Sequence, residues 1–136
     1  MSKVFFDTNI LVYLWDKRYP KKQARSRELV RTEFSHGAPC VSVQVLQEFF
    51  TTVTKKLGVA PVRAKEIISD FRTFETVLTD PGDVLSAIDA SIDWQISFWD
   101  ALIITAARKA NCAVVYSEDL NGGQRYGSVR VINPFA

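Results

Sequence analysis

Four acidic residues spread along the sequence could bring their carboxylates to one place: Asp7, Glu48, Asp100 and Asp119. Asp7 and Asp119 each follow a short apolar run that is typical of a buried strand. Because the functional crevice of an open α/β sheet lies beyond the carboxyl ends of its strands, we expect these two acids to converge there. Asp100 can join them from the start of a helix. Glu48 lies about six residues, or ~9 Å of helical rise, beyond Ser42, so its helix must lean over the crevice.

Clustered carboxylates are tolerated only when their charge is compensated. Like charges within a few ångströms drive one another toward protonation, and burial adds a further cost. Oxygen ligands without His or Cys suit Mg²⁺ or Mn²⁺, which bind through a few carboxylates, several waters and a substrate phosphate. Such ions polarise a phosphodiester, activate a bound water and stabilise the leaving oxygen. The four acids therefore favour metal-dependent hydrolysis of a phosphodiester.

The other common chemistry of RNA cleavage uses histidines as general acid and base, and it normally needs a pair of proton-transfer groups. His36 is the only histidine of the sequence, and it stands beside Gly37 in an expected loop. The sequence also offers no Ser-His-Asp set and no G-x-x-x-x-G-K-[ST] phosphate loop. The carboxylates are left as the candidate catalytic groups.

Each acid also has a purely structural interpretation. Asp7 could cap the helix that follows it, and Asp100 stands at the capping-box spacing after Ser97. Asp119 could belong to a turn, and Glu48 could be the exposed position of an amphipathic helix. Taken one at a time, none of the four acids identifies a metal site.

Short apolar runs alternate with segments of helical periodicity. Strands are predicted at 4–6, 40–42, 76–79, 113–116 and 129–132. Helices are predicted at 10–15, 21–34 and 43–58, from 61, from 81, and at 98–110. In the helix that begins at Pro81, the stripe that we expect to be buried consists of Val84, Leu85, Ile88 and Ile92. This alternation predicts an α/β fold with a parallel sheet.

The composition fits one domain over residues 1–136. A chain of 136 residues with 47% hydrophobic content can build one continuous core but is too short for two ordinary domains. No run approaches the roughly 18 to 20 apolar residues of a membrane span, and the first residues lack a signal-peptide layout, so we expect a soluble, cytoplasmic protein. Cys40 and Cys112 are expected to be reduced core residues.

The order and surroundings of the acids resemble a known family, the PIN-domain ribonucleases, and more narrowly the VapC-type toxins of bacterial and archaeal toxin–antitoxin modules. The resemblance covers the whole chain. Its most specific element is the Asp-Thr-Asn run at residues 7–9, after the first apolar run. It is corroborated by Phe98-Trp99-Asp100-Ala101 and by Ser117-Glu118-Asp119.

This resemblance implies a PIN-like three-layer fold, in which a central, mostly parallel sheet is flanked by helices. It implies that Mg²⁺ or Mn²⁺ is bound by the family's four acids, which fall on Asp7, Glu48, Asp100 and Asp119. The family's supporting polar positions fall on Thr8, Asn9, Ser42 and Ser117. The resemblance also implies a homodimer, a small VapB-like antitoxin that reaches into the acidic cleft, and a structured RNA substrate, commonly tRNA.

A basic segment extends from Lys17 to Arg31, although the net charge of the chain is only +2. Such a segment is most often a solvated helix face. A metal nuclease, however, must also hold the polyanion around its acidic centre, and phosphate contacts supply affinity without reading sequence. We therefore expect RNA contacts among Arg18, Lys21, Lys22 and Arg25.

Two rival functions stay open. A phosphatase or phosphotransferase of the haloacid-dehalogenase type would use Asp7 as a covalent nucleophile, but such folds carry another acid two residues later, where this sequence has Asn9. A non-catalytic RNA-binding protein on the same fold is the second rival. It would gain nothing from four acids that face RNA phosphates.

Overall fold

The computed structural model describes residues 3–136 and contains a six-stranded sheet with the strand order β3-β2-β1-β4-β6-β5. The strands are β1 Lys3–Phe6, β2 Cys40–Ser42, β3 Glu75–Val77, β4 Cys112–Tyr116, β5 Arg125–Tyr126 and β6 Val129–Ile132. All neighbours pair in parallel except β5, which runs antiparallel to β6. The short edge strand β5 was not predicted, and β3 lies slightly earlier than the predicted 76–79.

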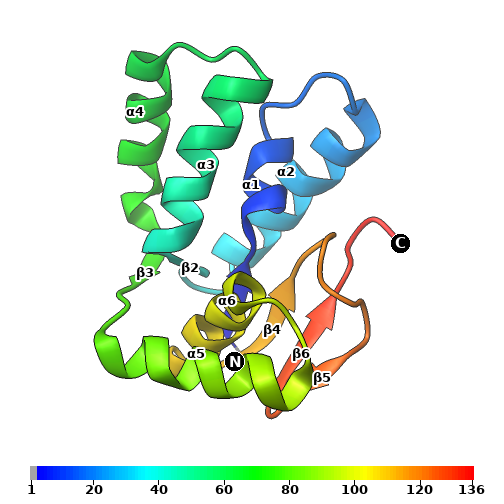
Figure 1. The fold of residues 1–136 in the computed structure, drawn as a ribbon. Helices are drawn as coiled ribbons and strands as arrows, with labels where there is room; N and C mark the ends of the chain where they lie inside the picture. The colour runs from blue at the N-terminus through cyan, green and yellow to red at the C-terminus, as the bar shows by residue number, and fades with distance from the viewer. Residues whose placement is uncertain (1–2) are drawn as a thin grey trace.

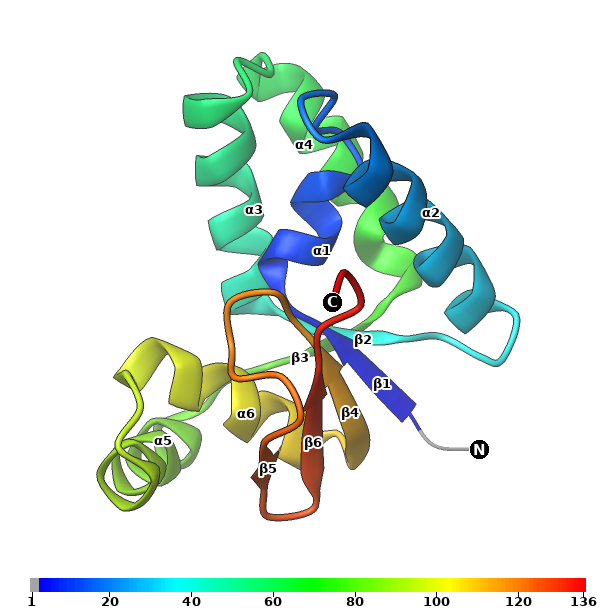
Figure 2. The same ribbon diagram turned by 90° about the vertical axis from the view of Figure 1, so that its right-hand side faces the viewer.

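Helices flank this sheet, as predicted (Figure 1). They are α1 Thr8–Tyr13, α2 Pro20–Phe34, α3 Val43–Lys56, α4 Pro61–Asp70, α5 Pro81–Trp94 and α6 Phe98–Lys109. A short 3₁₀ helix at Phe71–Thr73 follows α4. Helix α6 lies against the sheet with α5 beside it, whereas α1 to α4 gather beyond the carboxyl ends of β1 and β2 (Figure 2). The fold is thus α/β with a mostly parallel central sheet.

The central strands bring distant parts of the chain to one edge of the sheet. Phe5 of β1 pairs with Cys40 of β2 and with Val115 of β4. The N–H of Asp7 continues this ladder by donating to the carbonyl of Tyr116 at 3.0 Å. Because parallel strands end at the same edge, the residues that follow β1 and β4 lie side by side although about a hundred residues separate them.

Local signals place the helix starts. The side chain of Ser42 caps α3 by accepting from the N–H of Val45 at 3.3 Å. Pro61 and Pro81 occupy the first turns of α4 and α5, where a missing N–H costs nothing. Ser97 caps α6 by accepting from the N–H of Asp100 at 3.0 Å. The predicted structural role of Ser97 is therefore confirmed.

The predicted buried face of α5 is wrong. Leu85, Ile88 and Ile92 are exposed, at 64%, 41% and 68% of their surface. Ala87 and Ala90 are buried in their place, in a small cluster that also contains Ala101 of α6. Small alanine side chains let the two helices approach closely, so the large apolar residues face outward. The stripe that the sequence predicted to be buried is therefore a largely exposed apolar face in the described residues.

Cys40 and Cys112 are free and buried, as expected. The thiol of Cys40 donates to Glu75, whose carboxylate also binds Lys3 at 3.0 Å. Across residues 3–136 no helix combines the length and the apolar character that a bilayer crossing requires.

Candidate active site

A cavity of about 380 Å³ opens at the carboxyl edge of the sheet. All four predicted acids line it: Asp7, Glu48, Asp100 and Asp119. Thr8 and Asn9 line it as well, whereas Ser42 and Ser117 are buried and do not line it. Ser42 caps α3, and Ser117 donates a hydrogen bond to Asp7. The tertiary structure thus brings together side chains that the sequence separates by up to 112 positions, from Asp7 to Asp119.

Asp7 is the most buried of the four acids, with only 7% of its surface exposed. Its Oδ1 accepts from the N–H of Thr8 at 2.7 Å, and its Oδ2 accepts from the hydroxyl of Ser117 at 2.8 Å. Burial raises the pKa of this carboxyl to about 6; the two hydrogen bonds oppose that rise, and the nearby Glu48 and Asp119 add to it. Asp7 is therefore a carboxylate whose charge lacks a cationic partner among the described residues.

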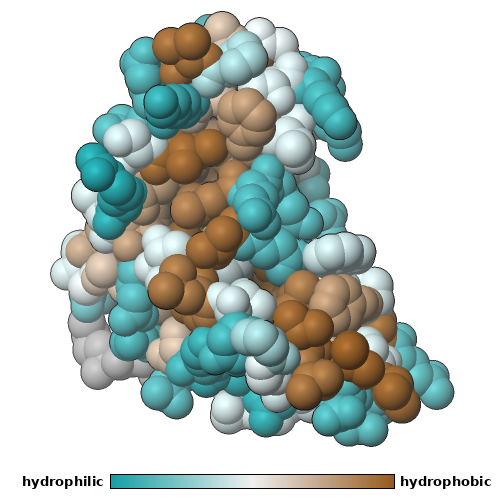
Figure 3. Space-filling view, turned by 60° about the vertical axis from the view of Figure 1, so that its left-hand side comes forward, coloured by the Kyte–Doolittle hydropathy of each residue, from teal (hydrophilic) through white to brown (hydrophobic). Residues whose placement is uncertain are grey.

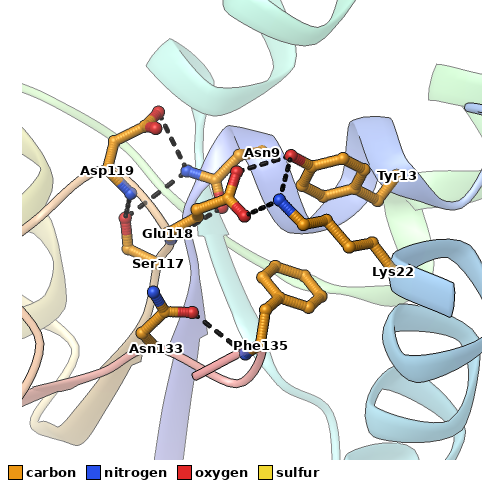
Figure 4. Close-up of polar contacts among 8 residues, drawn as sticks. All are labelled: Asn9, Tyr13, Lys22, Ser117, Glu118, Asp119, Asn133 and Phe135. Carbon is orange, nitrogen blue, oxygen red and sulfur yellow. Dashed lines mark hydrogen bonds and ion pairs between the residues drawn. The ribbon is translucent and has the colours of Figure 1, made fainter. Parts of the chain in front are cut away.

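Asn9 joins the two strand tips. Its amide nitrogen donates to Asp119 at 3.2 Å and lies 3.4 Å from the hydroxyl of Ser117 (Figure 4). Its carbonyl oxygen accepts from the N–H of Glu118 at 3.0 Å. The Ser117 hydroxyl in turn accepts from the N–H of Asp119 at 3.2 Å. The segment of residues 117–119, here called the acid loop, is consequently held in a fixed position against the end of β1.

Glu48 reaches the cavity because α3 packs against α1. The Thr8 hydroxyl donates to its Oε1 at 2.8 Å. Asp100 approaches from the first turn of α6, where its N–H is capped by Ser97 and its side chain faces the cavity. Each acid thus comes from a different element, and three of them are linked through the polar residues 8, 9 and 117.

The donor set fits a hard divalent cation, although the acids are not yet gathered around one point. Within residues 3–136 no three His, Cys, Asp or Glu side chains approach closely enough to form a ready-made ion site. Instead, Asp7, Glu48 and Asp119 each accept hydrogen bonds from nearby polar groups. Separate acids are expected where no cation offsets the repulsion between their charges. Four carboxylates on one cavity, one of them buried, are ligands of the type that Mg²⁺ or Mn²⁺ prefers.

A lysine ties the acid loop to helix α2. The ammonium group of Lys22 binds the carboxylate of Glu118, and the Tyr13 hydroxyl donates to the same carboxylate (Figure 4). The ammonium also lies 5.2 Å from the ring centre of Tyr13 and 5.6 Å from those of Tyr19 and Phe135. Lys22 is therefore surrounded by one carboxylate and three aromatic rings.

The four predicted RNA contacts take different positions. Arg18 lines the cavity, and its guanidinium forms two hydrogen bonds of 2.9 Å with the buried Asp16. Lys22 lies beside the site but is paired with Glu118. Arg25 donates to the carbonyl of Pro134 at 3.2 Å, and neither Arg25 nor Lys21 lines the cavity. The sequence alone could not orient these side chains, because all four lie in or beside one helix.

Some cavity residues were missed in the sequence. Gln44, Thr52 and Lys56 line the cavity together with Glu48. They recur every four residues along α3, so helical periodicity counted from Glu48 could have found them. Trp99 also lines the cavity. Its position directly before Asp100 was the available signal.

The sequence of residues 4–124 matches the family model described as the PIN domain. This match covers most of the chain. The chain belongs to the PIN domain family. No curated protein matches it.

Three solved structures with a similar fold are described as toxins or toxin–antitoxin complexes. A toxin–antitoxin complex from Klebsiella pneumoniae is similar with a TM-score of 0.73 and 14% identity, over 97% of this PIN domain chain and 98% of the other. A DNA-bound VapBC from Salmonella typhimurium is similar with a TM-score of 0.69 and 21% identity, over 96% and 97% of the two chains. Mycobacterium tuberculosis VapC20, described as a toxin that cleaves the sarcin–ricin loop, has a TM-score of 0.66 and 21% identity, over 86% and 90%.

Proposed function

We propose that this PIN domain is an endoribonuclease that depends on Mg²⁺ or Mn²⁺. The observation that supports this most strongly is the convergence of Asp7, Glu48, Asp100 and Asp119 on one cavity from four separate elements. These four acids are the candidate metal ligands. When bound, the ion supplies an activated water and stabilises the charge that develops on the phosphodiester.

The residues of the chain prepare the site for this chemistry. Thr8 and Ser117 each donate a hydrogen bond to Asp7, which favours its charged form and orients both of its oxygens. Asn9 and Thr8 hold Asp119 and Glu48 in the same way. Arg18, fixed by Asp16, is placed to contact a phosphate at the rim of the cavity. The acids therefore bind the ion, and the polar residues orient them.

We further propose that the enzyme is the toxin of a type II toxin–antitoxin system. Structural neighbours that contain an antitoxin support this, since the fold is shared over nearly the whole chain. The proposed partner is a small VapB-like antitoxin, and the proposed substrate is an RNA, with tRNA as one candidate. A small protein encoded beside this chain should inhibit its RNA cleavage when the two are purified together, and a neighbour without effect would contradict the toxin role.

The proposal includes a homodimer that buries the outward face of α5. Leu85, Ile88 and Ile92 present three large apolar side chains on one helix face. Figure 3 shows apolar side chains gathered on the lower part of the molecule, where α5 and α6 lie. A contiguous apolar face of this kind marks an interaction surface. A second copy covers such a face symmetrically, which is the commonest arrangement of soluble homodimers.

The decisive experiment measures RNA cleavage by the purified protein. We expect cleavage with Mg²⁺ or Mn²⁺, none with a chelator, and a loss of at least about 100-fold in Asp7→Asn and in Asp100→Asn, because neither variant retains the full ligand set. Asp70→Asn is the matched control, since this acid is exposed at the end of α4 and away from the cavity.

Three results would contradict the nuclease proposal. Full activity in Asp100→Asn would contradict the proposed metal site, because that variant lacks one of the four proposed ligands. Binding of RNA without any cleavage would favour a non-catalytic RNA-binding protein. Transfer of labelled phosphate to Asp7 would favour a phosphatase or phosphotransferase instead.

A further inference from the structure

Two large aromatic side chains are exposed at the cavity that holds the four acids. Trp99 has 62% of its surface exposed, and Tyr19 has 47%. Both line the cavity, Trp99 from the first turn of α6 and Tyr19 from the residue that precedes α2. Trp99 is the direct neighbour of Asp100, so an indole ring lies within one residue of a candidate catalytic acid.

The backbone of Trp99 is held in place. The side-chain amide of Gln44 on α3 donates to the Trp99 carbonyl at 3.2 Å. The ring of Phe98 packs edge-on against the indole, with the ring centres 5.1 Å apart. Ser97 caps the same turn of α6 through the N–H of Asp100. The indole is therefore an exposed ring on a fixed support, which keeps the entropic cost of ordering it on a ligand small.

A cation and a second ring lie in the same cavity. The Arg18 guanidinium lies 5.4 Å from the ring centre of Tyr19 and is held by the buried Asp16. Lys56 also lines the cavity. Cationic groups that follow a phosphate backbone, combined with aromatic rings on which bases stack, are the features by which proteins hold single-stranded nucleic acids. A base within a duplex cannot reach such a ring, because its faces are covered by its neighbours.

We propose that Trp99 is a stacking platform for an unpaired nucleobase next to the scissile phosphate. This rests on the proposed nuclease function and assigns to one residue of this chain a part in holding the substrate. The base adjacent to the phosphate at Asp100 lies on the indole, and Arg18 contacts the backbone beyond it.

The test measures binding rather than cleavage. A labelled single-stranded oligoribonucleotide, and the same strand annealed to its complement, are titrated with protein in EDTA and followed by fluorescence anisotropy. We expect the single strand to bind more tightly than the duplex. Trp99→Leu should weaken single-strand binding roughly ten-fold, whereas Trp99→Phe, which keeps a ring, should lose much less. Val62→Ala, at an exposed position of α4 outside the cavity, is the control and should bind as the wild type does.

Salt dependence separates stacking from charge. The slope of log affinity against log salt concentration counts the phosphate contacts that a protein neutralises. Trp99→Leu should lower the affinity without changing this slope, because it removes no charge. Arg18→Gln should make the slope shallower. An altered slope in Trp99→Leu would contradict stacking.

Abasic nucleotides give the sharpest readout. Each position of the oligonucleotide is made abasic in turn. At one position, loss of the base should weaken binding to the wild type several-fold but should hardly change binding to Trp99→Leu. Ring and base act as a coupled pair, so the loss of one removes the effect of losing the other. Equal effects in both proteins at every position would overturn the proposal. So would a Trp99→Leu variant that binds RNA normally but changes its oligomeric state, which would place Trp99 in a protein interface.

The nuclease proposal can fail independently of this inference. A protein that shows the coupling with the abasic position but never cleaves RNA would contradict the proposed function and leave the stacking platform in place. A protein that cleaves RNA but shows no coupling with any abasic position would support the proposed nuclease function and contradict the stacking platform.

Discussion

At the scale of single residues, Asp7 carries the strongest conflict between burial and charge. Its carboxylate is buried beside Glu48 and Asp119, and burial raises its pKa to about 6. Ser117 and Thr8 offset part of this cost with hydrogen bonds. Such a conflict is expected of the proposed cation site, because a negative charge kept for an ion is unfavourable until the ion binds.

We therefore predict that Asp7→Asn stabilises the metal-free protein while it abolishes cleavage. Between about pH 4 and pH 6 the folded protein binds a proton that the unfolded chain has released, so the contribution of Asp7 to stability is full below this window and lost as the pH rises through it. The variant should gain on the order of 1–3 kcal/mol in the free energy of unfolding at neutral pH, and little below about pH 4. Urea unfolding in EDTA at several pH values measures this.

The matched control for this prediction is Asp70→Asn, because this acid is exposed. Its free energy of unfolding should follow that of the wild type across the same pH range. A metal-free Asp7→Asn protein that is less stable than the wild type at neutral pH would contradict the unpaired charge that the structure shows.

At the scale of elements, the acid loop depends on helices that carry none of the four acids. Glu118 of this loop binds Lys22 of α2 and Tyr13 of α1. Asp119, the next residue, is linked to Asn9. The position of Asp119 is consequently set from both sides, by the end of β1 and by the packing of α1 and α2.

We predict that Glu118→Ala and Lys22→Met each raise the Mg²⁺ concentration needed for half-maximal cleavage, by roughly ten-fold, because residues that orient metal ligands typically change metal affinity by 10- to 100-fold. The maximal rate at saturating Mg²⁺ should fall much less. Titration of cleavage against Mg²⁺, together with direct Mn²⁺ binding, measures both effects.

The exposed ion pair of Arg63 and Glu66 on α4 supplies the control for this prediction. Surface pairs contribute little, so Glu66→Gln should leave the metal dependence unchanged. A Glu118→Ala variant with unaltered Mn²⁺ affinity would show that the acid loop keeps its position without α2.

At the scale of the whole molecule, the outward face of α5 determines the proposed assembly. We predict that the wild type is a dimer and that Ile88→Glu converts it to a monomer, because a charge would be buried at the centre of the contact. Ile88 is already 41% exposed in the single chain, so the fold itself should survive the change. Sedimentation equilibrium and far-ultraviolet circular dichroism test both statements.

Val62→Glu is the control for the dimer, since Val62 is 72% exposed on α4, outside the α5 face. It should remain a dimer. A monomeric wild type, or an Ile88→Glu protein that stays dimeric, would contradict the assignment of this face.

The sequence by itself was sufficient to predict most elements and to select four acids that line one cavity. Apolar periodicity, the cap at Ser97 and the prolines at 61 and 81 are local signals, and they placed the corresponding helices correctly. Asp7 and Asp119 each follow a predicted parallel strand, and parallel strands end at one edge of a sheet. The sequence therefore also implied that these two acids lie near each other. The expectation of a single domain and the catalytic roles of the acids stay predictions.

Only the tertiary structure determined which side chains of these elements are exposed and which groups they contact. Glu48 reaches the cavity because α3 packs on α1, and Lys22 turns toward Glu118 instead of solvent. The large apolar face of α5 points outward because alanines form its contact with α6. A local pattern shows that a helix has an apolar side, but the distance between groups far apart in the chain, and the partner that covers an apolar side, are set by packing.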